Sequence, residues 1–140
     1  MIQDWNDPEF CLLKVRENPL YLEFVKNQTP EICLEAVKQN GFTLVYVKEQ
    51  THEICLQAVK KDGYALEHVK KQTSEICLEA VKRDGLAFQY VEEQTPLIIH
   101  YLIKCHISYY ELFKKKNYIT IPDNEMVEFY EENPHLLLTL

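Results

Sequence analysis

The chain has 140 residues, of which 46% are hydrophobic and 26% charged, which suits one globular domain with a buried core. Its formal net charge of -7 argues against general nucleic-acid binding, which needs a basic surface. Only three glycines are present, which argues against glycine-rich phosphate loops, and no apolar run approaches the roughly 20 residues that cross a bilayer.

The N-terminal residues 1–6 are polar and acidic, so we expect no signal peptide. The five cysteines are an odd number, and four of them recur at a fixed interval. Without an export signal, we interpret them as reduced thiols and expect a cytoplasmic protein.

A unit of 22 residues recurs along the chain without a linker. The copies are residues 7–28, 29–50, 51–72 and 73–94, followed by a degenerate fifth copy at 95–116. The fifth copy keeps Thr95, Pro96 and Lys104 but loses the cysteine and glycine positions. Equivalent residues of tandem units stack in columns, which predicts a solenoid.

Each unit begins with a helix signal. A threonine at the N-cap position, or Asp7 in the first copy, is followed by proline at the first helical position or by a glutamate in the first turn. Apolar residues then follow at helical spacing. We expect Gly41 and its equivalents to end this helix in a left-handed C′ conformation, and the turn at Pro19, which replaces glycine in the first copy, to differ.

The second half of each unit predicts a helix of about two turns, because Leu44, Val47 and Gln50 share one face. Helices this short need packing to be stable. A leucine-rich repeat, with residues 44–47 as a strand, is the competing fold, but its leucine and asparagine ladder is missing. The sequence therefore favours an all-α fold, a short α-solenoid of 22-residue two-helix repeats.

The C-terminal segment, residues 117–140, breaks the period and predicts a helical cap that begins at Pro122 or Asp123. Its final residues are too apolar for a free tail, so they fold back onto the last repeat or meet another chain, and we favour folding back. If they meet another chain, they form a homo-oligomer contact through Leu136, Leu137, Leu138 and Leu140.

Two columns are interpreted as structural. The cysteine column is Cys11, Cys33, Cys55 and Cys77. Packed helices lie ~8–10 Å apart, too far for a disulfide or for thiolates that converge on zinc, so these cysteines read as small core residues. The glutamine column is Gln28, Gln50, Gln72 and Gln94, and its amides are expected to bridge backbone groups in a ladder along the stack.

Cys105 lies outside the cysteine column, beside His106 and five residues after His100. A metal site or a cysteine-dependent enzyme is the alternative use of these three residues. Nothing supplies the remaining ligands or an orienting carboxylate at recognisable spacing. We therefore expect no catalytic residue, no metal and no cofactor.

The strongest candidate for function is the basic column, which consists of Arg16, Lys38, Lys60, Lys82 and Lys104. Such a row could steer an acidic partner, and cations near helix C-termini also complement the helix dipole. A second basic column contains Lys26, Lys48, Lys70, Glu92 and Lys114. Two aromatic rows are partner anchors or inter-repeat core; the first contains Tyr46 and Tyr90 with Phe24 and His68 in register, and the second contains Phe42 and Tyr64.

The unit T-x-E-I-C-L-x-A-V-K-x-[ND]-G-x-x-[LF]-x-x-V-x-x-Q resembles the tandem repeats of domain-of-unknown-function family 4116, which is abundant in giant viruses of amoebae such as mimivirus. The resemblance covers residues 7 to about 116 and is tightest over 29–94. It implies a helical repeat and a viral or protist origin, and it implies no activity.

Together these patterns predict a non-catalytic helical-repeat module for protein–protein interaction or scaffolding, which binds an acidic or extended partner segment along the basic column. The alternative is a self-associating structural or virion component. We expect a protein partner and neither nucleic acid nor membrane, in the cytoplasm or, for a viral protein, in the host cytoplasm or virus factory.

Overall fold

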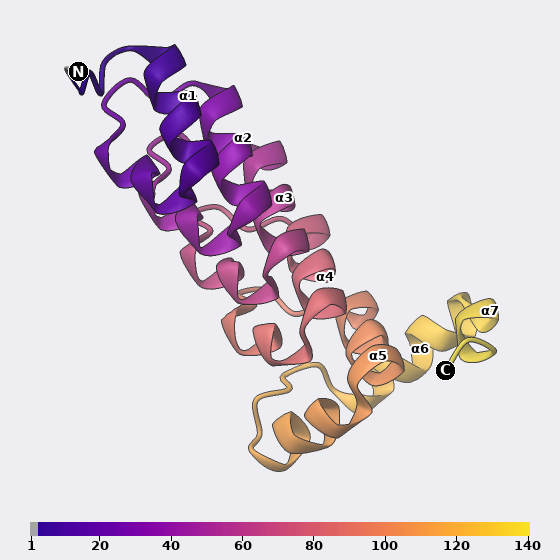
Figure 1. The fold of residues 1–140 in the computed structure, drawn as a ribbon. Helices are drawn as coiled ribbons and strands as arrows, with labels where there is room; N and C mark the ends of the chain where they lie inside the picture. The colour runs from indigo at the N-terminus through magenta and orange to yellow at the C-terminus, as the bar shows by residue number, and fades with distance from the viewer. Residues whose placement is uncertain (1–2) are drawn as a thin grey trace.

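A computed structural model describes residues 3–140, and over that range it contains helices and no strands. The α-helices are α1 (Pro8–Glu17), α2 (Pro30–Gln39), α3 (His52–Lys61), α4 (Ser74–Arg83), α5 (Pro96–Lys115), α6 (Asp123–Glu132) and α7 (Pro134–Leu137). Between the first five lie the 3-10 helices η1 (Pro19–Phe24), η2 (Gly41–Tyr46), η3 (Gly63–His68) and η4 (Gly85–Tyr90). Figure 1 shows α1 to α5 stacked along one axis, which confirms an all-α solenoid.

The predicted helix starts are confirmed by their hydrogen bonds. The threonine Oγ1 atoms at the N-cap positions accept from the backbone N–H three residues ahead, as Thr29 does from Ile32 at 3.3 Å. Asp7 caps α1 by accepting from the backbone N–H of Glu9 at 3.2 Å. These bonds satisfy donors that have no partner inside the helix, so each repeat has its own start signal.

The second element of each repeat has the predicted two turns, but it is a 3-10 helix. It spans six residues, which make two turns at three residues per turn. The stretch 44–47, the strand of the competing leucine-rich fold, lies at the end of η2 and in its cap. The leucine-rich reading is therefore wrong.

The expected left-handed conformation of the glycines is wrong, because no glycine in residues 3–140 has a positive φ. Gly41 is the first residue of η2, and it is fully packed against the next repeat. A Cβ at Gly63 would lie 2.7 Å from the carbonyl oxygen of Ala80, and a Cβ at Gly41 would collide with that of Ala58. Glycine is used here for close approach between repeats.

The expectation of a different turn at Pro19 is also wrong. Pro19 is the first residue of η1, as Gly41 is of η2. The preceding cap residues share one extended conformation, with φ -151 and ψ 113 at Asn18 and φ -147 and ψ 107 at Asn40. A helix start needs a negative φ and no internal hydrogen bond from its first N–H, so proline fits this position.

The core runs through the whole stack as one cluster. Both the α-helix and the 3-10 helix with its cap contribute buried apolar side chains in each of the first four repeats; in the second repeat these are Ile32, Cys33, Ala36, Val37, Leu44 and Val47. Burying a large apolar side chain stabilises a fold by ~1.5–3 kcal/mol. Because each repeat packs on its neighbours, this stabilisation belongs to the stack and not to a single repeat.

The fifth repeat departs from the pattern after His106. This residue has φ -146 and ψ 54 inside α5, and it falls where Asn40, Asp62 and Asp84 cap the earlier helices. The chain then continues as an α-helix, and Phe113 reaches back to pack on Phe88 with ring centroids 5.2 Å apart. The kink is therefore the ordinary inter-helix turn of the array, followed by a longer second helix.

The C-terminal helix α6 begins at Asp123, one of the two predicted starts, but the tail does not fold back onto the last repeat. Figure 1 shows α6 and α7 leaving the stack sideways from α5. Leu137, Leu138 and Leu140 are 49%, 89% and 55% exposed. Because these side chains remain exposed, the favoured fold-back onto the last repeat is wrong. Within residues 3–140 no helix combines the length and apolarity that a membrane crossing requires.

Candidate interaction surface

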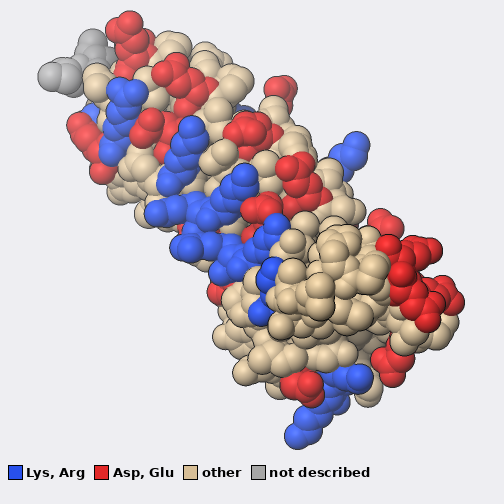
Figure 2. Space-filling view, turned by 90° about the vertical axis from the view of Figure 1, so that its right-hand side faces the viewer, with Lys and Arg blue, Asp and Glu red and all other residues tan. Residues whose placement is uncertain are grey.

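The basic column forms a continuous row on the face made by the α-helices. Arg16, Lys38, Lys60 and Lys82 each lie in the last turn of their helix, and Lys104 lies just before the kink in α5. Figure 2 shows a band of Lys and Arg side chains running along the stack, beside a band of Asp and Glu. The solenoid thus aligns cations that are 22 residues apart in the sequence.

The middle of the basic column is free of ion pairs. Arg16 Nε lies 3.7 Å from Glu35 Oε2, and Lys82 Nζ lies 3.2 Å from Glu79 Oε1. Lys38 and Lys60 are exposed and have no ion-pair partner among residues 3–140. Their charges are therefore available to a ligand.

At the C-terminal end, the basic column meets an aromatic ring. Lys82 Nζ lies 4.4 Å from the ring centroid of Tyr101, and Lys104 Nζ lies 5.6 Å from it. A ring face attracts cations, by ~0.5–1 kcal/mol at exposed sites. Tyr101 therefore holds two members of the column close together.

The cations of the basic column also stabilise the helices that carry them. A cation in the last turn interacts favourably with the helix dipole, by ~0.3–1 kcal/mol at the surface. Glu31, Glu53 and Glu75 lie in the first turns of their helices, where the same dipole favours anions. Helix stability alone therefore favours charges of these signs at these positions.

The glutamine column forms the predicted ladder, which is confirmed. Each Nε2 donates to a carbonyl oxygen of the next repeat, at 2.7 Å from Gln28 to Tyr46. Each Oε1 accepts from a backbone N–H two residues further on, at 2.9 Å from Lys48 in the same case. Gln94 makes the same pair of bonds to Tyr118 and Thr120, which follow the longer second helix of the fifth repeat. These two residues therefore take the place that the end of a 3-10 helix and the loop after it have in the earlier repeats.

The cysteine column is part of this ladder. The thiol of Cys77 donates to Gln72 Oε1 at 3.1 Å, and those of Cys33 and Cys55 donate to Gln28 and Gln50 at 3.6 Å. Burial raises the pKa of Cys33 and Cys77 to about 11. The cysteines are unpaired core residues, and within residues 3–140 no group of side chains could hold a metal ion.

A backbone oxygen begins the ladder. The carbonyl oxygen of Trp5 accepts from the backbone N–H of Lys26 and from the thiol of Cys11, both at 3.3 Å. These are the two bonds that Oε1 of a column glutamine accepts in the later repeats. The Trp5 ring packs edge-on against Phe10 at 5.2 Å, which holds this carbonyl in place.

Shallow cavities lie at the junctions between repeats, and no sequence pattern predicted them. One has a volume of about 260 Å³ and is lined by Gln28, Cys33 and Ile54. The equivalent one in the next repeat has about 350 Å³, lined by Gln50, Cys55 and Ile76. In the first, Lys48 Nζ already donates to the carbonyl of Lys26 at 2.8 Å. The cavity occurs at both places because equivalent residues meet at each junction between repeats.

The three residues of the cysteine-dependent alternative do not converge. Cys105 is exposed, while His106 directs Nε2 to the carbonyl oxygen of Lys82 at 3.2 Å. His100 is buried and pairs through Nδ1 with the hydroxyl of Tyr130 at 3.0 Å. In the part of the chain that the structure describes, no hydrogen bond joins Cys105 to either imidazole. The arrangement therefore offers this thiol no positioned base.

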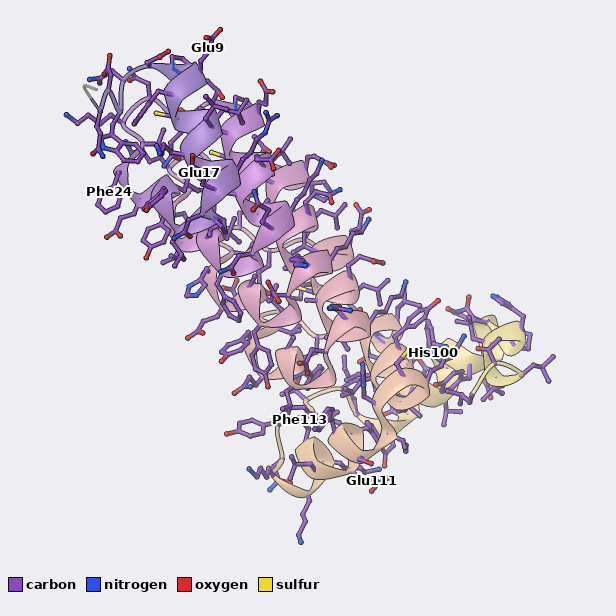
Figure 3. All side chains as sticks on the ribbon, in the orientation of Figure 1. Glu9, Glu17, Phe24, His100, Glu111 and Phe113 are labelled. Atoms are coloured by element: carbon purple, nitrogen blue, oxygen red, sulfur yellow. The ribbon has the colours of Figure 1, made fainter. Side chains whose placement is uncertain are left out.

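The aromatic rows are divided between core and surface. Tyr64 and Tyr90 pack edge-on across a junction, with centroids 6.2 Å apart, and both are half-buried. Phe24 and Phe42 are 50% and 43% exposed. Figure 3 shows Phe24 near the N-terminal end, away from the α-helical face. The aromatic rows and the basic column therefore do not form one site.

Comparison with known proteins yields one family. A family model described as Domain of unknown function (DUF4116) matches residues 7–51 and 51–95, each match spanning two of the 22-residue units. No curated protein and no solved structure matches the chain.

Proposed function

This chain belongs to the DUF4116 family, whose description names no activity, and from its own surface we propose that it is a non-catalytic helical-repeat interaction module. It binds an acidic, extended segment of a protein partner along the basic column. The observation that carries the proposal is the continuous row itself, with Lys38 and Lys60 unpaired at its centre within the described residues 3–140.

The distance between successive cations of the basic column sets the interval at which a ligand must carry its acidic side chains. Packed helices lie ~8–10 Å apart, and an extended chain in the polyproline II conformation advances ~3.1 Å per residue with about three residues per turn, so every third side chain lies on one face. An extended segment lying along the stack therefore meets one cation at about every third residue. Acidic side chains at that interval would contact successive members of the basic column, and the neighbouring acidic band would repel a segment shifted sideways.

A matched pair of variants tests this proposal. The probe is a fluorescein-labelled peptide of fifteen residues with glutamate at every third position, and binding is followed by fluorescence anisotropy at low salt. Lys38→Glu, Lys60→Glu and Lys82→Glu together should abolish binding. The control reverses Lys26, Lys48 and Lys70, which changes the net charge equally on the second basic column.

Binding that is lost only in the first variant supports the basic column as the site. Equal loss in both variants means that the peptide senses net charge alone, and unchanged affinity in the first variant means that it binds elsewhere. Either result overturns the proposed site. Circular dichroism on each variant checks that the helices remain folded.

We propose as a second candidate that the chain is a structural component that self-associates through Leu136, Leu137, Leu138 and Leu140. The exposure of three of these leucines on α7 and after it favours this function. Light scattering would compare the full chain with one that ends at Asn133. A dimer or larger species that reverts to a monomer on truncation supports self-association, and monomers in both cases overturn it.

We further propose that the protein acts in the cytoplasm, in the host cytoplasm or virus factory if its origin is viral. The unpaired state of all five cysteines supports a reducing compartment.

A further inference from the structure

His100 is the one buried histidine in residues 3–140, and it occupies a leucine position of the repeat. Leu34, Leu56 and Leu78 precede it at the 22-residue interval. Figure 3 shows it where α5 meets the C-terminal helices. Its ring centroid lies 5.7 Å from that of Tyr130 and 6.4 Å from that of Phe129, both on α6. The contact between α5 and α6 is therefore built around an imidazole.

The hydrogen bonding of this ring suits only its neutral form. Nδ1 lies 3.0 Å from the hydroxyl of Tyr130, while Nε2 is buried and has no hydrogen-bond partner among residues 3–140. In a neutral ring that keeps its proton on Nδ1, Nε2 carries a lone pair and has no hydrogen to donate. Protonation would place an N–H and a positive charge at Nε2, with no acceptor, inside the interface.

The groups around the ring do not stabilise a positive charge. On α5 the nearest are Tyr101 and Lys104, and on α6 they are Phe129 and Tyr130. From α4, Lys82 approaches α5 over the ring of Tyr101. Among residues 3–140 no carboxylate lies within ion-pair distance of His100. Burial lowers the pKa of His100, and the charge of Lys104 lowers it further.

We propose that α6 and α7 form a pH-sensitive arm, which is docked on α5 while His100 is neutral and released when His100 is protonated. Thermodynamic linkage gives the direction of this pH dependence. The docked state binds the proton more weakly than the released state, whose histidine has an ordinary pKa of ~6.5. Docking is therefore complete above that pH, and its equilibrium constant falls by up to about tenfold per pH unit below it, until the lowered pKa of the docked state is reached.

Release of the arm from α5 is a local event because of the way in which the arm is attached to the stack. In α6 and α7 no residue is fully buried, and α7 extends away from the stack. The buried core of the solenoid, from Cys11 to Phe113, is formed by the preceding helices, and α6 adds only the partly buried Met126 to it. Release of the arm therefore opens the end of α5 without unfolding the repeats, and it does not depend on the proposed binding along the basic column.

Hydrogen exchange of the full chain, read by mass spectrometry, tests this proposal. The protection factors of the α6 amides, corrected for the intrinsic effect of pH, should fall at least about tenfold between pH 7.5 and pH 5.0. Those of α2 and α3 should stay constant. The variant His100→Leu restores the residue of the other repeats, and its α6 protection should not depend on pH. The control His52→Gln, at an exposed histidine, should behave as the wild type.

Two results overturn the proposal. One is α6 protection in the wild type that does not change with pH, and the other is pH dependence that persists in His100→Leu. If that variant unfolds, an NMR titration of the wild-type imidazoles decides the question. A His100 ring that titrates at or above pH 6.5 is inconsistent with a docked neutral histidine, whereas a lower value joined to loss of α6 protection supports the arm.

Discussion

Gln50 donates a hydrogen bond from Nε2 to the main-chain carbonyl oxygen of His68 at 2.8 Å, across the junction between two repeats. Its Oε1 accepts from the backbone N–H of Lys70 and from the thiol of Cys55. One side chain thus serves these three polar groups of the next repeat, and its Nε2 also donates to the carbonyl oxygen of Leu44 in its own repeat at 3.4 Å. The stack is held by this amide as well as by its apolar core.

We expect Gln50→Leu to lower the free energy of unfolding by about 1–3 kcal/mol. The substitution leaves the carbonyl of His68 and the N–H of Lys70 without their partners, and an unmade hydrogen bond costs more than a made one gains. Urea unfolding followed by circular dichroism measures the change. Gln89→Leu, at an exposed glutamine outside the column, should change stability by less than about 0.5 kcal/mol. Equal losses in both variants would contradict the role of the ladder.

Gly63→Ala should destabilise the fold by about 1–3 kcal/mol, as overpacking of a filled interior does. The added methyl group would lie 2.7 Å from the carbonyl oxygen of Ala80, so the two repeats must separate to admit it. Thermal unfolding compares this variant with Glu67→Ala, an exposed change in the same 3-10 helix. Unchanged stability in Gly63→Ala would show that the junction has room for a side chain.

Phe113→Ala should destabilise the C-terminal end of the stack. The ring is 4% exposed and packs on Phe88, so its removal leaves a cavity of the kind that costs about 3–5 kcal/mol. Calorimetry should show a lowered transition, and hydrogen exchange should show that protection is lost first in the second half of α5. Leu138→Ala, at a side chain that is 89% exposed, serves as the control and should leave the monomer's stability unchanged.

Alkylation should distinguish Cys105 from the cysteine column. Cys105 is exposed, whereas the other four thiols are buried, and their burial raises the pKa of each. Iodoacetamide at pH 7.5 should add one group to the native chain, at Cys105, and five in denaturant. Cys105→Ser should then resist native alkylation. Rapid modification of a column cysteine would show that the repeats open more readily than their packing implies.

The period and the caps were predictable because both depend on local chemistry. A threonine followed by proline or glutamate satisfies the helix N-terminus wherever it occurs, and repetition places equivalent residues in rows. The bridging role of the glutamines followed from the same logic. The positions of Gln28 and its equivalents next to each cap left few backbone groups within their reach.

The glycine prediction failed because Asn-Gly at a helix end is compatible with two different turns. A left-handed C′ residue and the first residue of a 3-10 helix give the same sequence pattern, and they differ only in φ. Pro19 was the signal that separates them. Proline cannot adopt a positive φ, so its presence at an equivalent position already excluded the left-handed turn.

The end of the chain was harder to predict because it has no equivalent in the repeats. Leu136 to Leu140 read as apolar, and composition alone does not show whether the chain itself covers them. For the basic column, the sequence predicted the alignment of its members. Lys82 and Lys104 share the ring of Tyr101, a contact that depends on how α4 and α5 pack and that no local pattern indicates.

Each glutamine of the column forms hydrogen bonds to the repeat that follows it, so the junctions between repeats are interchangeable. If residues 51–72 were excised in register, Gln50 would precede Thr73 and face the carbonyl of Tyr90 and the N–H of Glu92, which Gln72 now bonds. Every junction of the shorter chain would remain complete. Recombination between the near-identical coding segments can therefore change the number of repeats in whole steps, so the solenoid can lengthen or shorten while every junction keeps its hydrogen bonds.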